Sequence, residues 1–234
     1  MRGGFFSKAI FGAIPGAALA SALLLSTCGL ETVLTLAPPE FVATSDASDY
    51  FRIRITGDND EPEFRGVEFY YKLYDSGAVI PDADINHQKY EDVVSAGFTR
   101  IASSDDEPGD ISKPLIKVPV SSRGKESEIT VALADIDDVK AIGVPKESGA
   151  WEEAGLPLRR TVIDGEGNYK AFNDFDEGDA DISGLGLDQS ELETGADVKM
   201  VLYTLSYGKE NLSTPAFSRA VYLENIEITI TSQS

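Results

Sequence analysis

Apolar side chains at every second position are the feature that most constrains what this chain can fold into. The segments Tyr50–Thr56 (YFRIRIT) and Phe64–Asp75 (FRGVEFYYKLYD) both follow this pattern. Successive side chains of a strand point to opposite faces of a sheet, so a period of two predicts strands with one buried face. The other face of 64–75 is aromatic and charged. The turn-forming residues of Gly57–Pro62 separate the two predicted strands.

The remaining strands are predicted by the same reasoning. Val198–Tyr207 is apolar on both faces, which is typical of a central strand. In Ser218–Thr231 the apolar phase shifts near Leu223–Asn225, which predicts a β-bulge, and a loop containing Pro215 is expected before this strand. Three shorter strands are expected at Phe98–Ala102, Leu115–Val120 and Glu128–Leu133. With a single short helix predicted at Gln88–Ala96, the fold class is all-β, an antiparallel β-sandwich.

Between Ala134 and Ala196 the periodic pattern is lost. This stretch contains the only tryptophan, Trp151, and many Asp, Glu and Gly residues. A long segment without structure is unusual inside a compact domain, so we expect a large insertion with short strands and turns. One hairpin is predicted within it, from Arg160–Ile163 to Tyr169–Phe172 around Gly165-Glu166-Gly167.

The N-terminus predicts export. Met1–Lys8 carries two basic residues and no acid, and an apolar run from Ala9 to Leu25 follows. A basic start, an apolar centre and a small-residue exit are typical of a signal peptide. The alternative is a retained membrane span, which needs roughly 20 apolar residues. The run is shorter and is broken by Gly12, Pro15 and Gly16, so residues 1–27 are interpreted as a signal peptide.

Cys28 is the only cysteine of the chain, and it directly follows Leu25-Ser26-Thr27. This sequence resembles the lipobox of bacterial lipoproteins, with Thr27 in place of the commoner Gly, Ala or Ser. The resemblance implies cleavage before Cys28, a diacylglyceryl thioether on its sulfur and an acyl group on the new N-terminus. Two or more acyl chains give stable membrane anchoring. The alternative is a structural cysteine that happens to follow the signal.

The signal peptide is expected to be followed by a tether at residues 28–39, which Pro38 and Pro39 stiffen. One β-sandwich domain is expected at residues 40–234, with the insertion at about 134–196. The Cys-Gly-Leu start, the Pro-Pro spacer and the Tyr-Tyr-Lys-x-Tyr strand resemble surface lipoproteins of spirochaetes. The pair of strands joined by the acidic turn is similar to the B–C hairpin of a fibronectin type III or immunoglobulin-like sandwich. These resemblances cover residues 28–75 and imply no activity.

The charge balance excludes several partners. The chain has 20 basic and 40 acidic residues, and removal of the signal leaves 18 against 40, a net charge of −22. Such a surface is repelled by nucleic-acid backbones and by anionic lipid headgroups. The membrane is therefore expected to be reached through the lipid on Cys28, and no nucleic acid is expected as a partner. A carbohydrate or protein ligand remains open, and we expect a monomer.

No catalytic residues are predicted. His87 is the only histidine, and with Cys28 assigned to the anchor neither a His–Cys zinc site nor a Cys–His nucleophile can form. No Gly-x-Ser-x-Gly elbow surrounds any serine. His87 is therefore interpreted as a surface loop residue. Two acids at the right separation suffice for glycoside hydrolysis, so a carboxylate-dependent hydrolase stays as an alternative.

If a calcium ion binds to this chain, we expect it at the acidic segment Asp174–Ser190. Asp179, Asp181 and Ser183 match alternate ligand positions of a calcium loop, and Gly184 follows them. Ser190 stands where such a loop needs a bidentate Glu, which favours a solvated acidic loop instead.

Taken together, the sequence features indicate a lipid-anchored, non-enzymatic envelope protein, on the outer membrane. An alternative is a carbohydrate- or host-protein-binding module, with Trp151 and tyrosines 70, 74, 169 and 207 as an aromatic platform.

Overall fold

The computed structural model describes residues 34–44, 50–103, 108, 113–132, 142–143, 158–210 and 214–232 of the chain. Thr35 to Ser234 form one compact unit, distinct from residues 1–34. The predicted signal peptide, Cys28 and Trp151 lie outside the described residues. None of the helices in the described part has the length and apolar composition that a membrane span requires.

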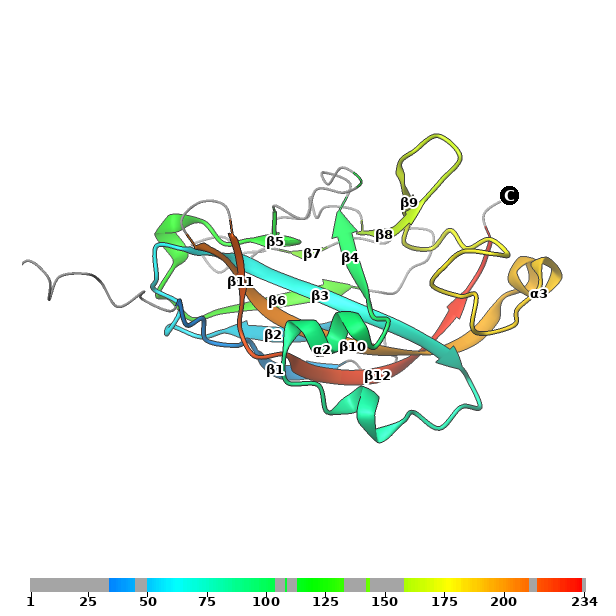
Figure 1. Cartoon of the computed structure of the whole chain (residues 1–234), viewed down its shortest axis with the longest axis horizontal. Coiled ribbons are helices and arrows are strands. Elements are labelled where there is room, and N and C mark those ends of the chain that lie inside the picture. The colour runs from blue at the N-terminus through cyan, green and yellow to red at the C-terminus, as the bar shows by residue number, and fades with distance from the viewer. Residues whose placement is uncertain are drawn as a thin grey trace, which may run out of the picture. The chain divides into compact units, whose positions relative to one another are not determined.

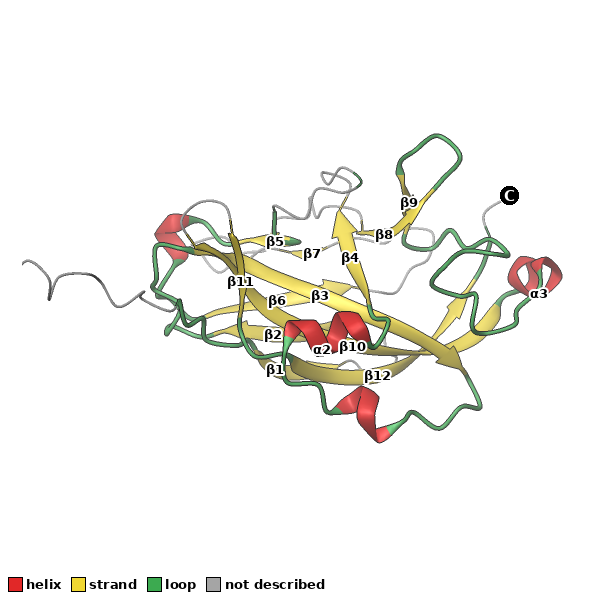
Figure 2. Cartoon of the chain, viewed as in Figure 1, coloured by secondary structure: helices red, strands yellow, loops and turns green. Residues whose placement is uncertain are grey.

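Two antiparallel sheets make up this unit (Figures 1 and 2). The smaller sheet has the order β1-β2-β6-β7, with bounds Glu40–Thr44, Tyr50–Ile55, Ser127–Ala132 and Ile142–Gly143. The larger sheet has the order β11-β10-β3-β4-β8-β9, with bounds Thr214–Phe217, Ala196–Glu210, Phe64–Asp75, Thr99–Ser103, Leu158–Ile163 and Tyr169–Ala171. In addition β12 (Val221–Ile230) pairs with β10, and β5 (Ile116–Lys117) pairs with β3. The predicted all-β sandwich is confirmed.

Part of the strand order matches the immunoglobulin-like plan. The order β1-β2-β6 matches strands A, B and E of that plan, and β12-β10-β3 matches strands G, F and C. The predicted B–C hairpin needs a correction, because β2 and β3 do not pair. The acidic turn at 57–62 instead carries the chain from one sheet to the other, and both strands bury their alternating apolar residues between the sheets.

The main core lies between the two sheets. Phe51 of β2 contacts Phe69 of β3 with 5.2 Å between the ring centroids, and both rings are fully buried. The predicted central strand is β10, which pairs with β3 on one edge and with β12 and β11 on the other. Its residues 200–208 are all buried, as expected for a strand that is covered on both faces.

A second, smaller core covers the outer face of the large sheet. Tyr70, Val201, Tyr203 and Leu205 project from this face and are buried against α2 (Tyr90–Ser95) and the segment that precedes it. The helix lies in the predicted range 88–96 and is shorter than predicted. Three more short helical segments are η1 (Asp82–Ile85), η2 (Val120–Ser122) and α3 (Gln189–Thr194).

The predicted β-bulge is confirmed. Val201 pairs with Asn225 and Tyr203 with Tyr222, so β12 carries one more residue than β10 between these pairs. A second bulge was not predicted. Tyr207 pairs with Gly66 but Gly208 pairs with Phe64, which leaves Arg65 as the extra residue of β3. Bulges bend a strand, and both occur on long strands of the large sheet.

Two segments differ from the sequence prediction. The segment expected as a loop around Pro215 is strand β11, and Pro215 is tolerated because β11 pairs only with the end of β10. The strand predicted at Leu115–Val120 is reduced to the two residues of β5, followed by η2. A strand of two residues is set by one local pairing and not by a repeating pattern.

The described part of the insertion is built as expected from short elements. The predicted hairpin is β8–β9, and the backbone amides of Glu166 and Asn168 donate to the Asp164 carboxylate in its turn. Strand β8 extends the large sheet by pairing with β4. Phe175, Ile182 and Leu192 are buried, so the segment after the hairpin is packed onto the domain.

Candidate functional site

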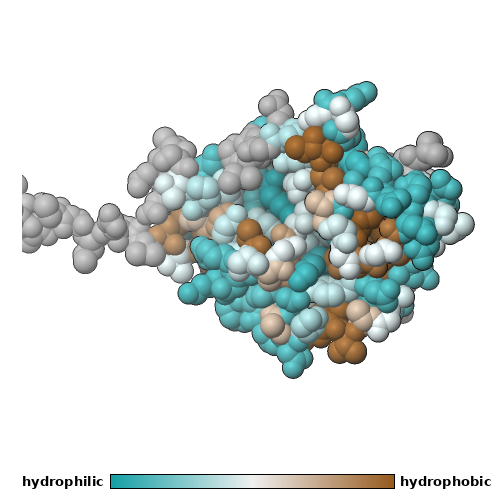
Figure 3. All heavy atoms as spheres, turned by 45° about the vertical axis from the view of Figure 1, so that its right-hand side comes forward, coloured by the Kyte–Doolittle hydropathy of each residue, from teal (hydrophilic) through white to brown (hydrophobic). Residues whose placement is uncertain are grey.

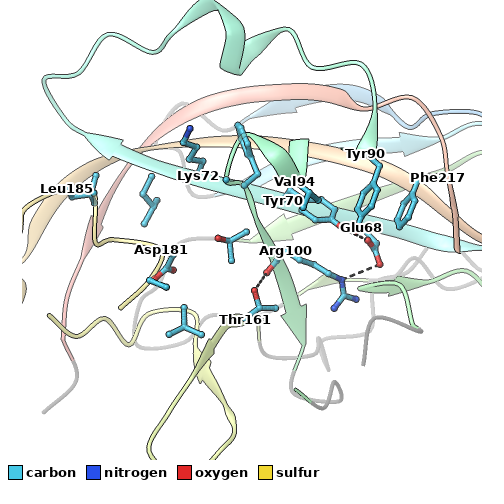
Figure 4. A pocket seen from close by; sticks show the side chains of 17 residues that line it. Glu68, Tyr70, Lys72, Tyr90, Val94, Arg100, Thr161, Asp181, Leu185 and Phe217 are labelled. Atoms are coloured by element: carbon cyan, nitrogen blue, oxygen red, sulfur yellow. Dashed lines mark hydrogen bonds and ion pairs between the residues drawn. The ribbon is translucent and has the colours of Figure 1, made fainter. Parts of the chain in front are cut away.

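A groove of 520 Å³ opens on the outer side of the large sheet (Figure 4). It exists because β4 pairs with β3 only through Tyr70 and Tyr71 and then turns to pair with β8. The space left beside β3 is closed by α2 and β11 at one end and by residues 180–185 of the insertion at the other. In Figure 4 the side chains of Tyr90 and Phe217 lie at one end, that of Leu185 at the other, and Arg100 lies between them.

A buried ion pair lies in this groove. Arg100 Nε donates to Glu68 Oε1 over 3.2 Å, and the Tyr70 hydroxyl donates to Glu68 Oε2 over 2.6 Å. Glu68 is 1% exposed and Arg100 is 7% exposed. The register explains the contact, because Tyr70 is opposite Arg100 and Glu68 is two residues away on the same face of β3. Burial, together with the charge of Glu68, raises the pKa of Tyr70 far above its ordinary value.

Apolar side chains form a wall beside the ion pair. Tyr90 and Phe217 stack with 3.9 Å between ring centroids and an interplanar angle of 5°, and Tyr70 meets Tyr90 edge-on. Val94 of α2 is 43% exposed at the rim. Hydrophobic residues otherwise reach the surface in small separate patches on a largely hydrophilic face (Figure 3). The groove thus combines half-buried rings with one ion pair.

A second polar cluster holds the insertion against the sheet. Arg160 is fully buried, and its Nη1 donates to both carboxylate oxygens of Asp181 over 2.7 and 2.8 Å. Its Nη2 donates to Asp179 Oδ2 over 2.6 Å and to the Asp174 carbonyl, and its guanidinium lies 3.9 Å from the centroid of the Phe175 ring. Lys170 Nζ bonds Asp179 Oδ1 over 2.6 Å. We call these residues the Arg160 cluster.

Two of the three predicted calcium ligands, Asp179 and Asp181, are part of this cluster. Asp179 and Asp181 face Arg160, and the Ser183 hydroxyl donates to the Ala180 carbonyl. Burial alone raises the pKa of Asp179, but the hydrogen bonds from Arg160 and Lys170 outweigh it and hold the pKa below its ordinary value. Arg160 and Lys170 therefore supply the positive charge that a calcium ion would otherwise bring to these carboxylates.

His87 lies in a loop, as expected, but its side chain is largely covered, which the interpretation as a surface residue missed. Its side chain is 13% exposed and packs between the rings of Phe98 and Tyr203. Its backbone amide donates to the Tyr203 hydroxyl, which donates in turn to the Asp84 carbonyl. The polar sequence around His87 gave no sign of this, because the aromatic partners come from β10 and from the segment after α2.

The described tyrosines of the predicted aromatic platform do not share one exposed surface. Tyr70 and Tyr207 are buried, and the Tyr74 hydroxyl donates to the Asp84 carboxylate.

Of the many possible carboxylate pairs, Glu68 and Asp181 both line the groove. Each of them faces a guanidinium, Arg100 and Arg160 respectively.

A further polar contact fixes the start of the domain. The side chain of Asn59 is 1% exposed and forms two hydrogen bonds of 2.9 Å with the backbone of Ala37, one to its carbonyl and one from its amide. The Ser206 hydroxyl donates to the same carbonyl over 2.6 Å, and Leu36 is buried beside Gly208. We call this contact the Asn59 clamp.

Comparison of the chain with protein families, with curated proteins and with solved structures found no match. The site therefore rests on its own geometry. Sequence reasoning missed the ion pair, although one signal was present. Glu68 is a charged residue within a strand whose neighbours are aromatic, and such a residue is buried only when it is paired.

Proposed function

We propose that this chain is a lipid-anchored, extracytoplasmic envelope protein without enzymatic activity, and that its groove binds a ligand. The groove is the observation that supports binding. It lies on a rigid sheet, its walls are mainly apolar, and a few polar groups converge in it, as in small-molecule sites. The lipobox-like sequence before Cys28 supports the anchor, with attachment to the outer membrane.

The Asn59 clamp fits this arrangement. Since the chain is held at Leu36 and Ala37, eight peptide steps separate Cys28 from Leu36. Fully extended, these steps span at most about 30 Å. A lipid on Cys28 would keep this end of the domain close to the membrane surface, while the groove stays open on the outer face of the large sheet.

A carboxylate-dependent hydrolase is the weaker alternative. Both acidic groups of the groove, Glu68 and Asp181, are already engaged in ion pairs with guanidinium groups. Their arrangement supports ligand binding or structural pairing in preference to catalysis by a carboxylate pair.

The anchor is tested by expressing Cys28→Ala beside Thr27→Ala, which keeps a small residue before the cysteine. We expect labelled fatty acid to be incorporated into the wild type and Thr27→Ala only, and Cys28→Ala to leave the membrane fraction. Equal labelling or equal membrane retention of Cys28→Ala would overturn the anchor.

The groove is tested with Val94→Lys, which places a charge at its rim. Val120→Lys is the matched control, because Val120 is 73% exposed and does not line the groove. Ligand-observed NMR with a set of small fragments on the full chain should give hits that Val94→Lys removes and Val120→Lys keeps. Fragment hits that persist in Val94→Lys would contradict a ligand site here.

A further inference from the structure

We propose that the ligand of the groove is an uncharged oligosaccharide. This inference rests on the proposed binding function and adds the chemical class of the ligand. Three properties of the groove carry it, namely its charge balance, the sequence of polar and apolar surfaces along it, and its size.

The groove is electrically balanced in a strongly acidic protein. Two carboxylates, Glu68 and Asp181, and two cations, Lys72 and Arg100, line it, and all four have ion-pair partners within the chain. The whole chain carries a net charge of −20. An anionic ligand would be repelled by this surplus and would find no surplus cation in the groove. A cationic ligand would find no surplus carboxylate there, so the balance favours a neutral ligand.

The order of surfaces excludes a purely apolar ligand. The Glu68–Arg100 pair lies beside the Tyr90–Phe217 wall, and Lys72 and Thr161 lie between that wall and the Leu185 end of the groove (Figure 4). An acyl chain that fills the groove would cover the half-buried side chains of Lys72 and Thr161 without offering them a hydrogen bond, which costs free energy. A sugar offers C–H surfaces to the aromatic and aliphatic walls and, at the same time, hydroxyl groups to these half-buried polar side chains.

Thr99 and Thr161 add polar groups to the lining of the groove. Thr161 lines the groove from β8, and its hydroxyl donates to the Arg100 carbonyl over 3.1 Å. Together with the Tyr90 hydroxyl, these side chains distribute hydrogen-bonding groups along the groove and do not concentrate them at one point. This distribution suits a ligand with several hydroxyl groups. The volume of 520 Å³ leaves room for a short oligosaccharide.

The test is calorimetric titration of the full chain, held in a detergent without a sugar headgroup. The neutral probes are maltotriose, cellotriose and triacetylchitotriose, and the comparison probes are trigalacturonate and decanoate. We expect at least one neutral trisaccharide to bind with a dissociation constant below about 1 mM, and the anionic sugar and the fatty acid not to bind.

Val94→Lys should weaken the binding of that trisaccharide by about tenfold or more, and Val120→Lys should leave it unchanged. Both positions are exposed, so neither variant is expected to unfold the domain. Failure of all neutral sugars overturns the ligand class, as does binding that Val94→Lys leaves intact. The fragment experiment then decides separately whether the groove binds ligands at all.

Discussion

At the scale of single residues, the most consequential side chain is Arg160. It is fully buried and faces two carboxylates, a carbonyl and an aromatic ring. Burial alone lowers the pKa of its guanidinium, but Asp181, Tyr71 and Asp179 outweigh burial and raise it. The charge is thus kept inside the protein by its partners. Removal of one member of such a group leaves the others buried without compensation.

We therefore predict that Arg160→Met lowers the free energy of unfolding by about 3–5 kcal/mol, which urea denaturation can measure. Arg54→Met is the matched control. Arg54 also faces acidic side chains, Glu126 and Glu128 among them, but it lies at the surface, where water screens such pairs. The control should lose far less stability. Equal losses in the two variants would show that burial does not set the strength of the Arg160 cluster.

The same cluster predicts a pH dependence. The pKa of Asp179 is held below its ordinary value in the folded state, so the unfolded chain binds more protons as the pH falls. Its contribution to stability is present above the unfolded pKa of about 3.9 and is lost as the pH falls through the lower folded value. The free energy of unfolding should therefore decrease between pH 5 and pH 3. Over this range the difference between wild type and Arg160→Met should shrink, because protonated aspartates no longer need a cation. A difference that stays constant in urea titrations from pH 7 to pH 3 would contradict this.

At the scale of secondary-structure elements, most strands were predictable from their pattern, including the short β4, β6, β8 and β9, whereas β11 and the extent of β5 were not. The alternation in Tyr50–Thr56 and Phe64–Asp75 gave β2 and β3 within one residue, since each strand buries a full row of side chains. Strand β11 was missed because Pro215 is tolerated only through its edge position, which is a property of the partner strand. The Glu68–Arg100 pair was missed for a similar reason, because 32 residues separate its members and only the β3–β4 register joins them.

The bulge of β3 gives a prediction for this scale. A Cβ atom on Gly66 would lie 1.8 Å from the Ile116 carbonyl oxygen, so an alanine there cannot coexist with the β3–β5 pairing. We predict that Gly66→Ala destabilises the domain by about 2–3 kcal/mol, as overpacking does, and that it detaches β5. The measurements are urea denaturation and hydrogen exchange of the amides at 116–118. Gly165→Ala, where a Cβ atom meets nothing within 4 Å, should be close to neutral. Undisturbed exchange at β5 in Gly66→Ala would refute the close approach.

At the scale of the whole molecule, the acidic charge opposes folding while local pairing supports it. The chain has twice as many acidic as basic residues, and several of its cations are committed to internal pairs such as Arg160–Asp181 and Arg100–Glu68. The remaining acids repel one another across the surface. Such repulsion acts over the screening length of the solution, whereas buried pairs are screened much less.

Salt should therefore stabilise this protein. Raising the ionic strength from 0.01 M to 0.15 M shortens the screening length from about 30 Å to about 8 Å, which weakens surface repulsion and leaves the buried pairs nearly unchanged. We predict a higher urea midpoint in the presence of sodium chloride, with most of the gain below 0.15 M.

Calcium and magnesium chloride at equal ionic strength separate screening from specific binding at Asp179, Asp181 and Ser183. Because Arg160 and Lys170 already face these aspartates, we expect the two divalent salts to act alike. A gain specific to calcium would show instead that the ion displaces these cations, and a midpoint that falls with sodium chloride would show that surface pairs outweigh the net repulsion.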